Sequence, residues 1–169
     1  MSQRKKSFTS GYTMIELLIV VSIVAMFIAI VAAIDLRGSL WKGRDAKRKT
    51  DLHKLVTIME DYYNDYGRYP PENIPPNGKI AGAPWGSSFS QYVSQLPKDP
   101  LSPRNEYYYQ TDSTGKFFVI YAKLENISDP DIARLGCQSN CGIDADHKVY
   151  NYLVTSTNVK ITDGVPVTN

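Results

Sequence analysis

The clearest pattern in the chain is an apolar run near its N-terminus. From Leu17 to Ile34 the 18 residues are apolar except for Ser22. A helix rises about 1.5 Å per residue, and about 20 apolar residues cross the hydrocarbon core of a bilayer. The run therefore predicts a membrane-spanning helix. The alternative is a cleaved secretory signal with a cut near Val31-Ala32-Ala33, but the run is long for such a signal and no Ala-x-Ala follows it.

A second pattern, amphipathic rather than apolar, follows the run. Apolar residues recur at i, i+3, i+4 and i+7 through four turns, at Leu52, Leu55, Val56, Met59, Tyr62, Tyr63 and Tyr66. Because no proline interrupts residues 12–66, we expect one long helix, with an assembly or membrane half at 12–34 and an amphipathic half at 35–66. Two helices hinged near Gly38 and Gly43 are the alternative. Gly67, followed by Pro70-Pro71, marks the expected end of the helix.

Residues 67–169 predict a globular head of mixed character. The part at 67–105 is rich in Pro, Gly, Ser and Asn and reads as a long connection, in which Phe89 to Leu96 suggest one or two helical turns. Within 106–169, strands are expected at Glu106–Gln110, Lys116–Leu124 and Lys148–Ser156. Short strands in sequence order favour an antiparallel sheet on the amphipathic helix, which is an α+β fold.

Tyrosines are numerous, with 12 in the chain. Tyr107, Tyr108 and Tyr109 alternate faces in a strand, so we expect at least one of them to be exposed. An exposed tyrosine would serve subunit contacts or adhesion, whereas a buried one packs in the core with its hydroxyl bonded.

Charge adds an asymmetry that the net value of +2 conceals. The N-terminus holds Arg4, Lys5 and Lys6 without an acid, and removing these three charges would leave −1. Six basic residues follow the apolar run, so the excess of positive charge does not set the orientation in a membrane. Asp45 and Lys49 stand at the i,i+4 spacing of a helical ion pair. No basic face for nucleic acid is evident.

The residues before the apolar run carry the most specific motif. The sequence Gly11-Tyr12-Thr13-Met14-Ile15-Glu16-Leu17-Leu18-Ile19-Val20-Val21 closely resembles the class III signal of type IV prepilins. The resemblance implies that a prepilin peptidase cuts between Gly11 and Tyr12 on the cytoplasmic side and methylates the new amine of Tyr12. Tyrosine at the first mature position departs from the commoner phenylalanine.

Glu16 is the acid that this motif carries into the apolar segment. A buried acid costs up to about 2.5–3.5 kcal/mol at the bilayer centre, less near the edge, so it needs a partner. The amine of Tyr12 lies about one helical turn away. Resemblance to pilins implies that Glu16 instead neutralises the Tyr12 amine of a neighbouring subunit and so fixes the axial stagger. The alternative is a carboxylate that reaches water at the membrane edge.

Three further segments resemble bacterial pilins and the major pseudopilin of type II secretion. They are Asp51-Leu52-His53-Lys54-Leu55, Asp65-Tyr66-Gly67-Arg68-Tyr69-Pro70 and Leu96-Pro97-Lys98-Asp99-Pro100. After the last of these, Leu101-Ser102-Pro103 stands where that family often has Gly-Asn. The resemblance implies the pilin fold.

Two cysteines, Cys137 and Cys141, lie between glycines in the C-terminal part. In an oxidising compartment they predict a disulfide-closed loop; a zinc site would need two more ligands, and His147 is the only imidazole nearby. Asp144 and Asp146 follow in a region comparable to the calcium-binding loop of the major pseudopilin. We therefore include calcium binding by these two acids as a hypothesis, beside the alternative that they are simply solvated.

No nucleophile constellation, phosphate loop or metal signature is evident, which favours a structural protein over an enzyme. We expect a subunit of a type IV pilus-like filament that self-associates through its apolar helix. Its expected partners are prepilin peptidase, an inner-membrane assembly platform and, before assembly, membrane lipid. The precursor would be a single-pass protein of the inner membrane with its head outside the cytoplasm, and the product an extracellular or periplasmic filament. The alternatives are the major pseudopilin of a type II secretion system and a non-polymerising single-span protein with a binding head.

Overall fold

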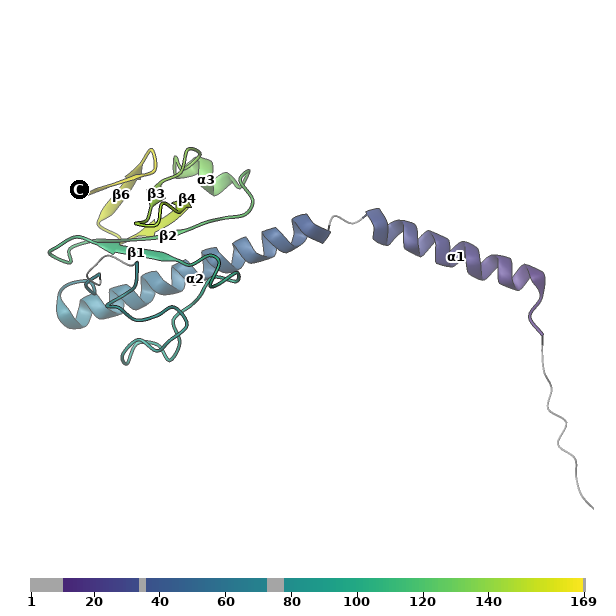
Figure 1. Cartoon of the computed structure of the whole chain (residues 1–169), viewed down its shortest axis with the longest axis horizontal. Coiled ribbons are helices and arrows are strands. Elements are labelled where there is room, and N and C mark those ends of the chain that lie inside the picture. The colour runs from purple at the N-terminus through teal and green to yellow at the C-terminus, as the bar shows by residue number, and fades with distance from the viewer. Residues whose placement is uncertain (1–10, 34–35, 73–77, 169) are drawn as a thin grey trace, which may run out of the picture. The chain divides into compact units, whose positions relative to one another are not determined.

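The structure, a computed structural model, describes residues 11–33, 36–72 and 78–168. The chain divides into two compact units, Met1–Ser39 and Leu40–Asn169. Helix α1 (Met14–Ala33) belongs to the first unit, and nearly all of helix α2 (Leu36–Tyr66) belongs to the second. Figure 1 shows both helices and the head that is built on α2.

Helix α1 contains the predicted membrane span. Residues Met14–Ala32 have a mean hydropathy of 2.9 and are long enough to cross a bilayer. Whether one helix runs on through residues 34 and 35 lies outside the described residues. Helix α2 continues without a break through Gly38 and Gly43, so the structure shows no hinge at these two glycines.

Helix α2 ends where the sequence predicts. Gly67 has a positive φ of 66°, and its N–H donates to the carbonyl of Tyr63 at 2.7 Å, which is the αL type of helix end. The apolar stripe of α2 forms one side of the head core, since Leu52, Leu55 and Met59 are fully buried. The stripe is therefore a packing surface, as the periodicity indicated.

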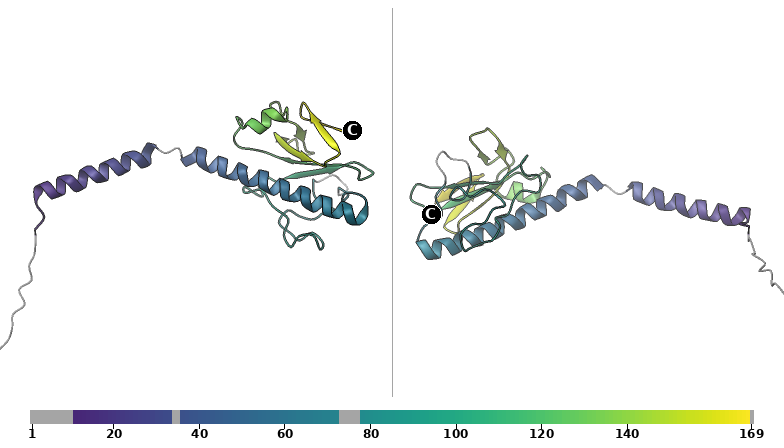
Figure 2. Two further views of the ribbon diagram at one scale, coloured as in Figure 1. Left: turned by 180° about the vertical axis from the view of Figure 1, so that it is seen from behind. Right: turned by 60° about the horizontal axis from the view of Figure 1, so that its bottom comes forward.

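The central sheet has three antiparallel strands. Strand β2 (Phe118–Ala122) lies between β1 (Tyr108–Thr111) and β5 (Tyr152–Thr155). Each strand overlaps one predicted segment but is shorter. All five residues of β2 are buried because α2 covers one side of the sheet and the C-terminal elements lie on the other (Figures 1 and 2). The α+β pilin fold is confirmed.

The covering layer was not predicted, apart from β4, which lies within the predicted strand at Lys148–Ser156. It consists of α3 (Pro130–Arg134), β3 (Gly142–Ile143), β4 (Val149–Tyr150), β6 (Val159–Thr162) and β7 (Val165–Thr168). The expected single strand at Lys148–Ser156 is divided at Asn151, with β4 pairing to β3 and β5 pairing to β2. The division has a clear cause: the Asn151 side chain accepts from the N–H of Leu124 at 2.7 Å and donates to its carbonyl at 3.1 Å.

The same layer explains why the tyrosine prediction was wrong. Tyr107, Tyr108 and Tyr109 are all buried, with 2%, 6% and 0% of their surface exposed. The Tyr109 hydroxyl donates to the carbonyl of Pro70 at 2.7 Å, while the ring of Tyr108 stacks on Tyr150 at 5.8 Å between centroids. Because both faces of β1 are covered, alternation along the strand exposes none of the three side chains.

The connection between α2 and β1 contains no helix in its described residues, so the predicted helical turns at Phe89–Leu96 were wrong. Phe89 and Val93 instead form an isolated antiparallel bridge around a tight turn, in which Ser90 has a positive φ of 47°. The apolar residues Ile80, Phe89 and Leu96 are still buried. Apolar spacing alone does not separate a helical turn from a compact irregular turn that buries the same side chains.

Candidate assembly helix and the contacts that anchor the head

The predicted processing site lies just before α1. Gly11 and Tyr12 are not helical, Tyr12 is 84% exposed, and among the described residues other than the direct neighbours of Gly11 no atom lies within 4 Å of a Cβ built on it. The peptide bond between them is therefore sterically accessible. Cleavage after Gly11 and methylation of Tyr12 stay predictions.

Glu16 takes part in a capping box at the start of α1. The N–H of Glu16 donates to the hydroxyl oxygen of Thr13 at 3.3 Å, and the N–H of Thr13 donates to the Glu16 carboxylate at 3.3 Å. These reciprocal bonds satisfy two of the backbone donors that a helix start leaves free, and the carboxylate lies at the positive end of the helix dipole. The signal in the sequence, Thr-x-x-Glu before an apolar run, was available and was missed.

The surface of α1 is apolar on every side. Its large side chains are 49–84% exposed within the chain, from Val24 at the low end to Met14 at the high end. Each such side chain is worth about 1.5–3 kcal/mol when it leaves water, so the helix requires lipid or other helices around it. Ser22 does not interrupt this surface, because its hydroxyl donates to the carbonyl of Leu18 at 2.8 Å.

A buried arginine anchors the head to α2. Arg48 is 0% exposed and binds Asp99 through two bonds, of 2.7 and 3.1 Å, and also binds Asp45 and Glu125 at 2.7 Å each. Burial acts to lower the pKa of Arg48, but the hydrogen bonds to Asp99 and Glu125 raise it above its usual value. The hydrogen bond from Arg44 is the main cause that lowers the pKa of Glu125 to about 2, and Arg48 adds to it. Arg48 and Glu125 are therefore both charged near neutral pH.

The acids of this cluster also bind backbone N–H groups, which ties loops to the helix. Asp45 accepts from Glu125 at 3.0 Å and from Asn126 at 2.8 Å, and Asp99 accepts from Leu101 at 2.8 Å. The Leu-Pro-Lys-Asp-Pro segment was recognised in the sequence, but its partner Arg48 was not. Without the fold, nothing indicated that these residues, 51 positions apart, meet.

A second ion pair joins α2 to α3. The Lys49 ammonium lies 2.7 Å from Asp129 and 2.6 Å from Asp131. The expected helical pair of Asp45 with Lys49 was therefore wrong: Asp45 pairs with Arg48 three positions later, and Lys49 points to the covering layer.

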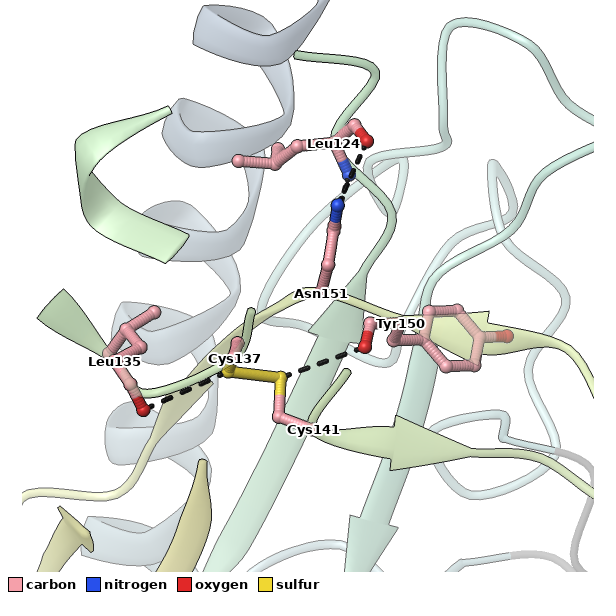
Figure 3. The surroundings of a disulfide bond; sticks show 6 residues. All are labelled: Leu124, Leu135, Cys137, Cys141, Tyr150 and Asn151. Carbon is pink, nitrogen blue, oxygen red and sulfur yellow. Dashed lines mark hydrogen bonds between the residues drawn. A yellow bond between two sulfur atoms is a disulfide. The ribbon is translucent and has the colours of Figure 1, made fainter. Parts of the chain in front are cut away.

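The predicted disulfide between Cys137 and Cys141 is present, with 4.9 Å between the Cα atoms (Figure 3). Cys137 is fully buried, and the Cys141 sulfur lies 3.8 Å from the carbonyl oxygen of Tyr150. The hairpin of β6 and β7 packs closely on this loop, since a Cβ on Gly136 would lie 2.5 Å from the Cα of Asp163. The disulfide loop thus connects α3, the β3–β4 pair and the C-terminal hairpin.

The two acids of the calcium hypothesis lie in the loop between β3 and β4. Asp144 accepts from the N–H groups of Asp146 and Lys148 at 2.9 Å each and from the hydroxyl of Tyr150 at 2.9 Å. Asp146 is exposed. No group of three or more His, Cys, Asp or Glu side chains gathers around a common point in the described parts of the chain. Calcium binding by Asp144 and Asp146 stays a prediction.

Comparison with known proteins agrees with this arrangement. A family model described as the prokaryotic N-terminal methylation motif matches residues 6–32. The chain is 27% identical over 147 residues to type II secretion system core protein G of Aeromonas hydrophila, a match that covers 84% of this chain and 92% of that protein. No solved structure matches. The methylation motif, a relative matched through most of its length, and the α+β head on a helix support a pilin-like filament subunit, similar to type IV pilins and type II secretion pseudopilins.

Proposed function

We propose that the chain is made as a precursor in the inner membrane with residues 1–11 as its leader and its head outside the cytoplasm. Prepilin peptidase cuts between Gly11 and Tyr12 and methylates the new amine. The exposed, non-helical Gly11–Tyr12 bond next to a span of 19 residues supports this order of events.

The mature subunit then assembles through α1. The observation that carries this proposal is a helix of 20 residues that is apolar on all sides and carries one acid, Glu16, in its first turn. When the helix leaves lipid, helices of other subunits must replace the lipid. Glu16 would then meet the Tyr12 amine of a neighbouring subunit, and only the correct axial stagger would pair both charges.

Within this family we propose a secretion-type filament, a pseudopilus, with an inner-membrane assembly platform as partner. The match over 92% of a type II secretion core protein favours it, as do the helix end at Gly67 and the Leu96–Pro100 segment. A type IV pilus is the second candidate, favoured by the disulfide loop of Cys137 and Cys141. Loss of the gene would abolish secretion of exported enzymes in the first case and surface pili or twitching in the second.

The role of the head in either filament is structural rather than enzymatic. It is anchored to α2 by Arg48 and stiffened by the disulfide, so it moves as one body with its helix. We propose no nucleic acid as a partner. Calcium, if it binds through Asp144 and Asp146, would brace the β3–β4 loop.

Mass spectrometry of the mature N-terminus tests the processing step. The expected result is a chain that starts at a methylated Tyr12. A chain that retains Met1, or one that starts near Ile34, would contradict the proposal.

Three variants test assembly and separate charge from capping. Glu16→Gln keeps a capping-box partner but removes the charge, Thr13→Ala removes the box but keeps the charge, and Glu16→Ala removes both. We expect filaments to fail with Glu16→Gln and Glu16→Ala but to form with Thr13→Ala, while all three variants still insert in the membrane. An unaffected biological output in Glu16→Gln and Glu16→Ala, with no filaments detected, would point instead to a non-polymerising membrane protein with a binding head.

A further inference from the structure

Three large apolar side chains are exposed although they belong neither to the core of the head nor to α1. Trp41 is 46% exposed, Leu40 60% and Ile127 80%, although all three are large apolar side chains. Trp41 and Ile127 line a groove of about 480 Å³ together with Arg104 and Lys123. We call Trp41, Ile127, Arg104 and Lys123 the interfacial patch.

The charge of the interfacial patch is positive. Arg104 and Lys123 also line a neighbouring groove of about 330 Å³, to which His147, Lys148 and one acid, Glu106, contribute. Neither Arg104 nor Lys123 forms an ion pair with any residue that the structure describes, and both are exposed. The acid of the first groove, Glu125, is already held by Arg44 and Arg48 at 2.5 and 2.7 Å. The cations of the patch are therefore available to an external anion.

The sequence keeps this patch close to the membrane. Trp41 follows Ala32, the last residue of the span, by nine positions. Residues from Leu36 to Trp41 are helical and rise about 1.5 Å each. The four steps from Ala32 to Leu36 cover at most about 3.6 Å each. Trp41 therefore stays within roughly 20 Å of the hydrocarbon edge, whatever the direction of the chain between them.

The side-chain types of the patch fit a lipid surface. Tryptophan is enriched where a protein crosses the headgroup level, because its ring is apolar and its N–H is polar. Arginine and lysine near such a surface bind the phosphates of anionic lipids. A groove that joins an exposed tryptophan and isoleucine to two free cations has both properties.

We propose that, before assembly, the head docks on the membrane through the interfacial patch, with Trp41 and Ile127 at headgroup level and Arg104 and Lys123 on the phosphates of anionic phospholipids. The proposal rests on the membrane insertion stated above. It gives the head a defined resting position, from which the subunit must be released when it joins a filament.

Tryptophan fluorescence of the full chain tests the docking directly. The chain has two tryptophans, Trp41 in the patch and Trp85 in the core at 9% exposure. The protein is placed in vesicles of equal parts phosphatidylcholine and phosphatidylglycerol, with or without bromine on the acyl chains as a quencher. We expect bromine to quench the wild type and to leave Trp41→Phe, which reports Trp85 alone, nearly unchanged. Trp85 is present in both proteins, so the difference between their quenching reports Trp41 alone.

The charges are tested by a matched pair of double variants. Removing one cation near an anionic surface should lower the ratio of docked to free heads about five-fold. Quenching of Trp41 should therefore fall steeply in Arg104→Gln/Lys123→Gln and in vesicles of phosphatidylcholine alone. It should stay unchanged in Lys116→Gln/Lys160→Gln, which removes two exposed lysines elsewhere on the head.

Flotation with the vesicles tests membrane insertion of the chain separately from docking of its head. A chain that does not float contradicts membrane insertion and hence the proposed function. A chain that floats without quenching of Trp41 overturns the docking alone. A blue shift of Trp41 without quenching by bromine, seen only when chains are dense enough to cross-link, would assign the interfacial patch to a second copy of the chain and would also overturn the lipid proposal.

Discussion

Replacing Arg48 by methionine would show how strongly the head is fixed to its helix. Methionine keeps an unbranched apolar stem but removes the guanidinium that binds Asp99, Asp45 and Glu125. The side chains of Asp99 and Asp45 are only 2% and 3% exposed, so their charges would remain buried without a cation. Removing one partner of a buried ion pair typically costs about 3–5 kcal/mol. We expect the free energy of unfolding of the head to fall by about this amount and its melting temperature to fall by roughly 10 °C.

The assay should follow the head rather than α1, which stays helical in detergent. The fluorescence of Trp85, buried in the head core, and the near-ultraviolet circular dichroism report loss of tertiary packing. Lys54→Met is the matched control, because Lys54 lies on the same helix, is exposed and forms no ion pair with any residue that the structure describes. A substitution at such a surface position usually changes the free energy of unfolding by no more than about 0.5 kcal/mol. The reasoning is refuted if Arg48→Met destabilises the head no more than Lys54→Met does.

The pH dependence gives a second check with a definite sign. Arg48 contributes to the low pKa of Glu125, so in Arg48→Met this pKa should rise towards its usual value of 4.5, and the stabilisation that is lost is one that the wild type has at neutral pH but not near pH 2. The difference in stability between Arg48→Met and the wild type should therefore be smaller at acidic pH than at neutral pH. A difference that grows on acidification would contradict the structure.

Four further outcomes follow from single sites. The pKa of Glu125 is about 2 in the folded chain against 4.5 for a free side chain, so its stabilising effect is complete above about pH 4.5 and is lost towards pH 2. In Glu125→Gln the free energy of unfolding should therefore fall less steeply on acidification, as measured by denaturation at a series of pH values. Gly43→Ala should raise the melting temperature by a stabilisation of about 1 kcal/mol, because Gly43 is helical and an added Cβ meets nothing within 4 Å. Gly136→Ala should instead destabilise the C-terminal hairpin, seen as faster hydrogen exchange there, since its φ is +72° and its Cβ would meet backbone at 2.5 Å. Replacing both Cys137 and Cys141 by serine should cost about 2 kcal/mol in thermal unfolding, because the loop that they close is short.

The two helices and the end of α2 could be predicted from the sequence because their signals are local. The apolar run, the stripe from Leu52 to Tyr66 and the end of α2 at Gly67 each depend on residues within a few turns of one another. The disulfide was predictable for a similar reason, since its cysteines are four positions apart. The capping box of Thr13 and Glu16 was equally local and could have been found.

The sheet was predictable only in outline. Its three strands lie where β-branched and aromatic residues alternate, but the break at Asn151 depends on a bond to Leu124, 27 positions away. The covering layer of α3, β3–β4 and β6–β7 consists of elements of two to five residues, too short to leave a periodic signal. Core packing of tyrosines was one of the two interpretations of the sequence, but that all three at 107–109 are buried depends on that layer and was not predicted.

The sequence by itself determined the class of the protein: a processing signal, a helix that must be surrounded by lipid or by other helices, and a head on its amphipathic half. Only the tertiary structure decided which charges are internal. Arg48, Lys49 and Arg104 look alike as basic residues in the sequence, yet the first is fully buried among acids, the second reaches α3 and the third faces solvent beside Trp41. The physical reason is that the environment of a charge depends on neighbours brought together by folding, whereas apolar periodicity is a property of the adjacent chain.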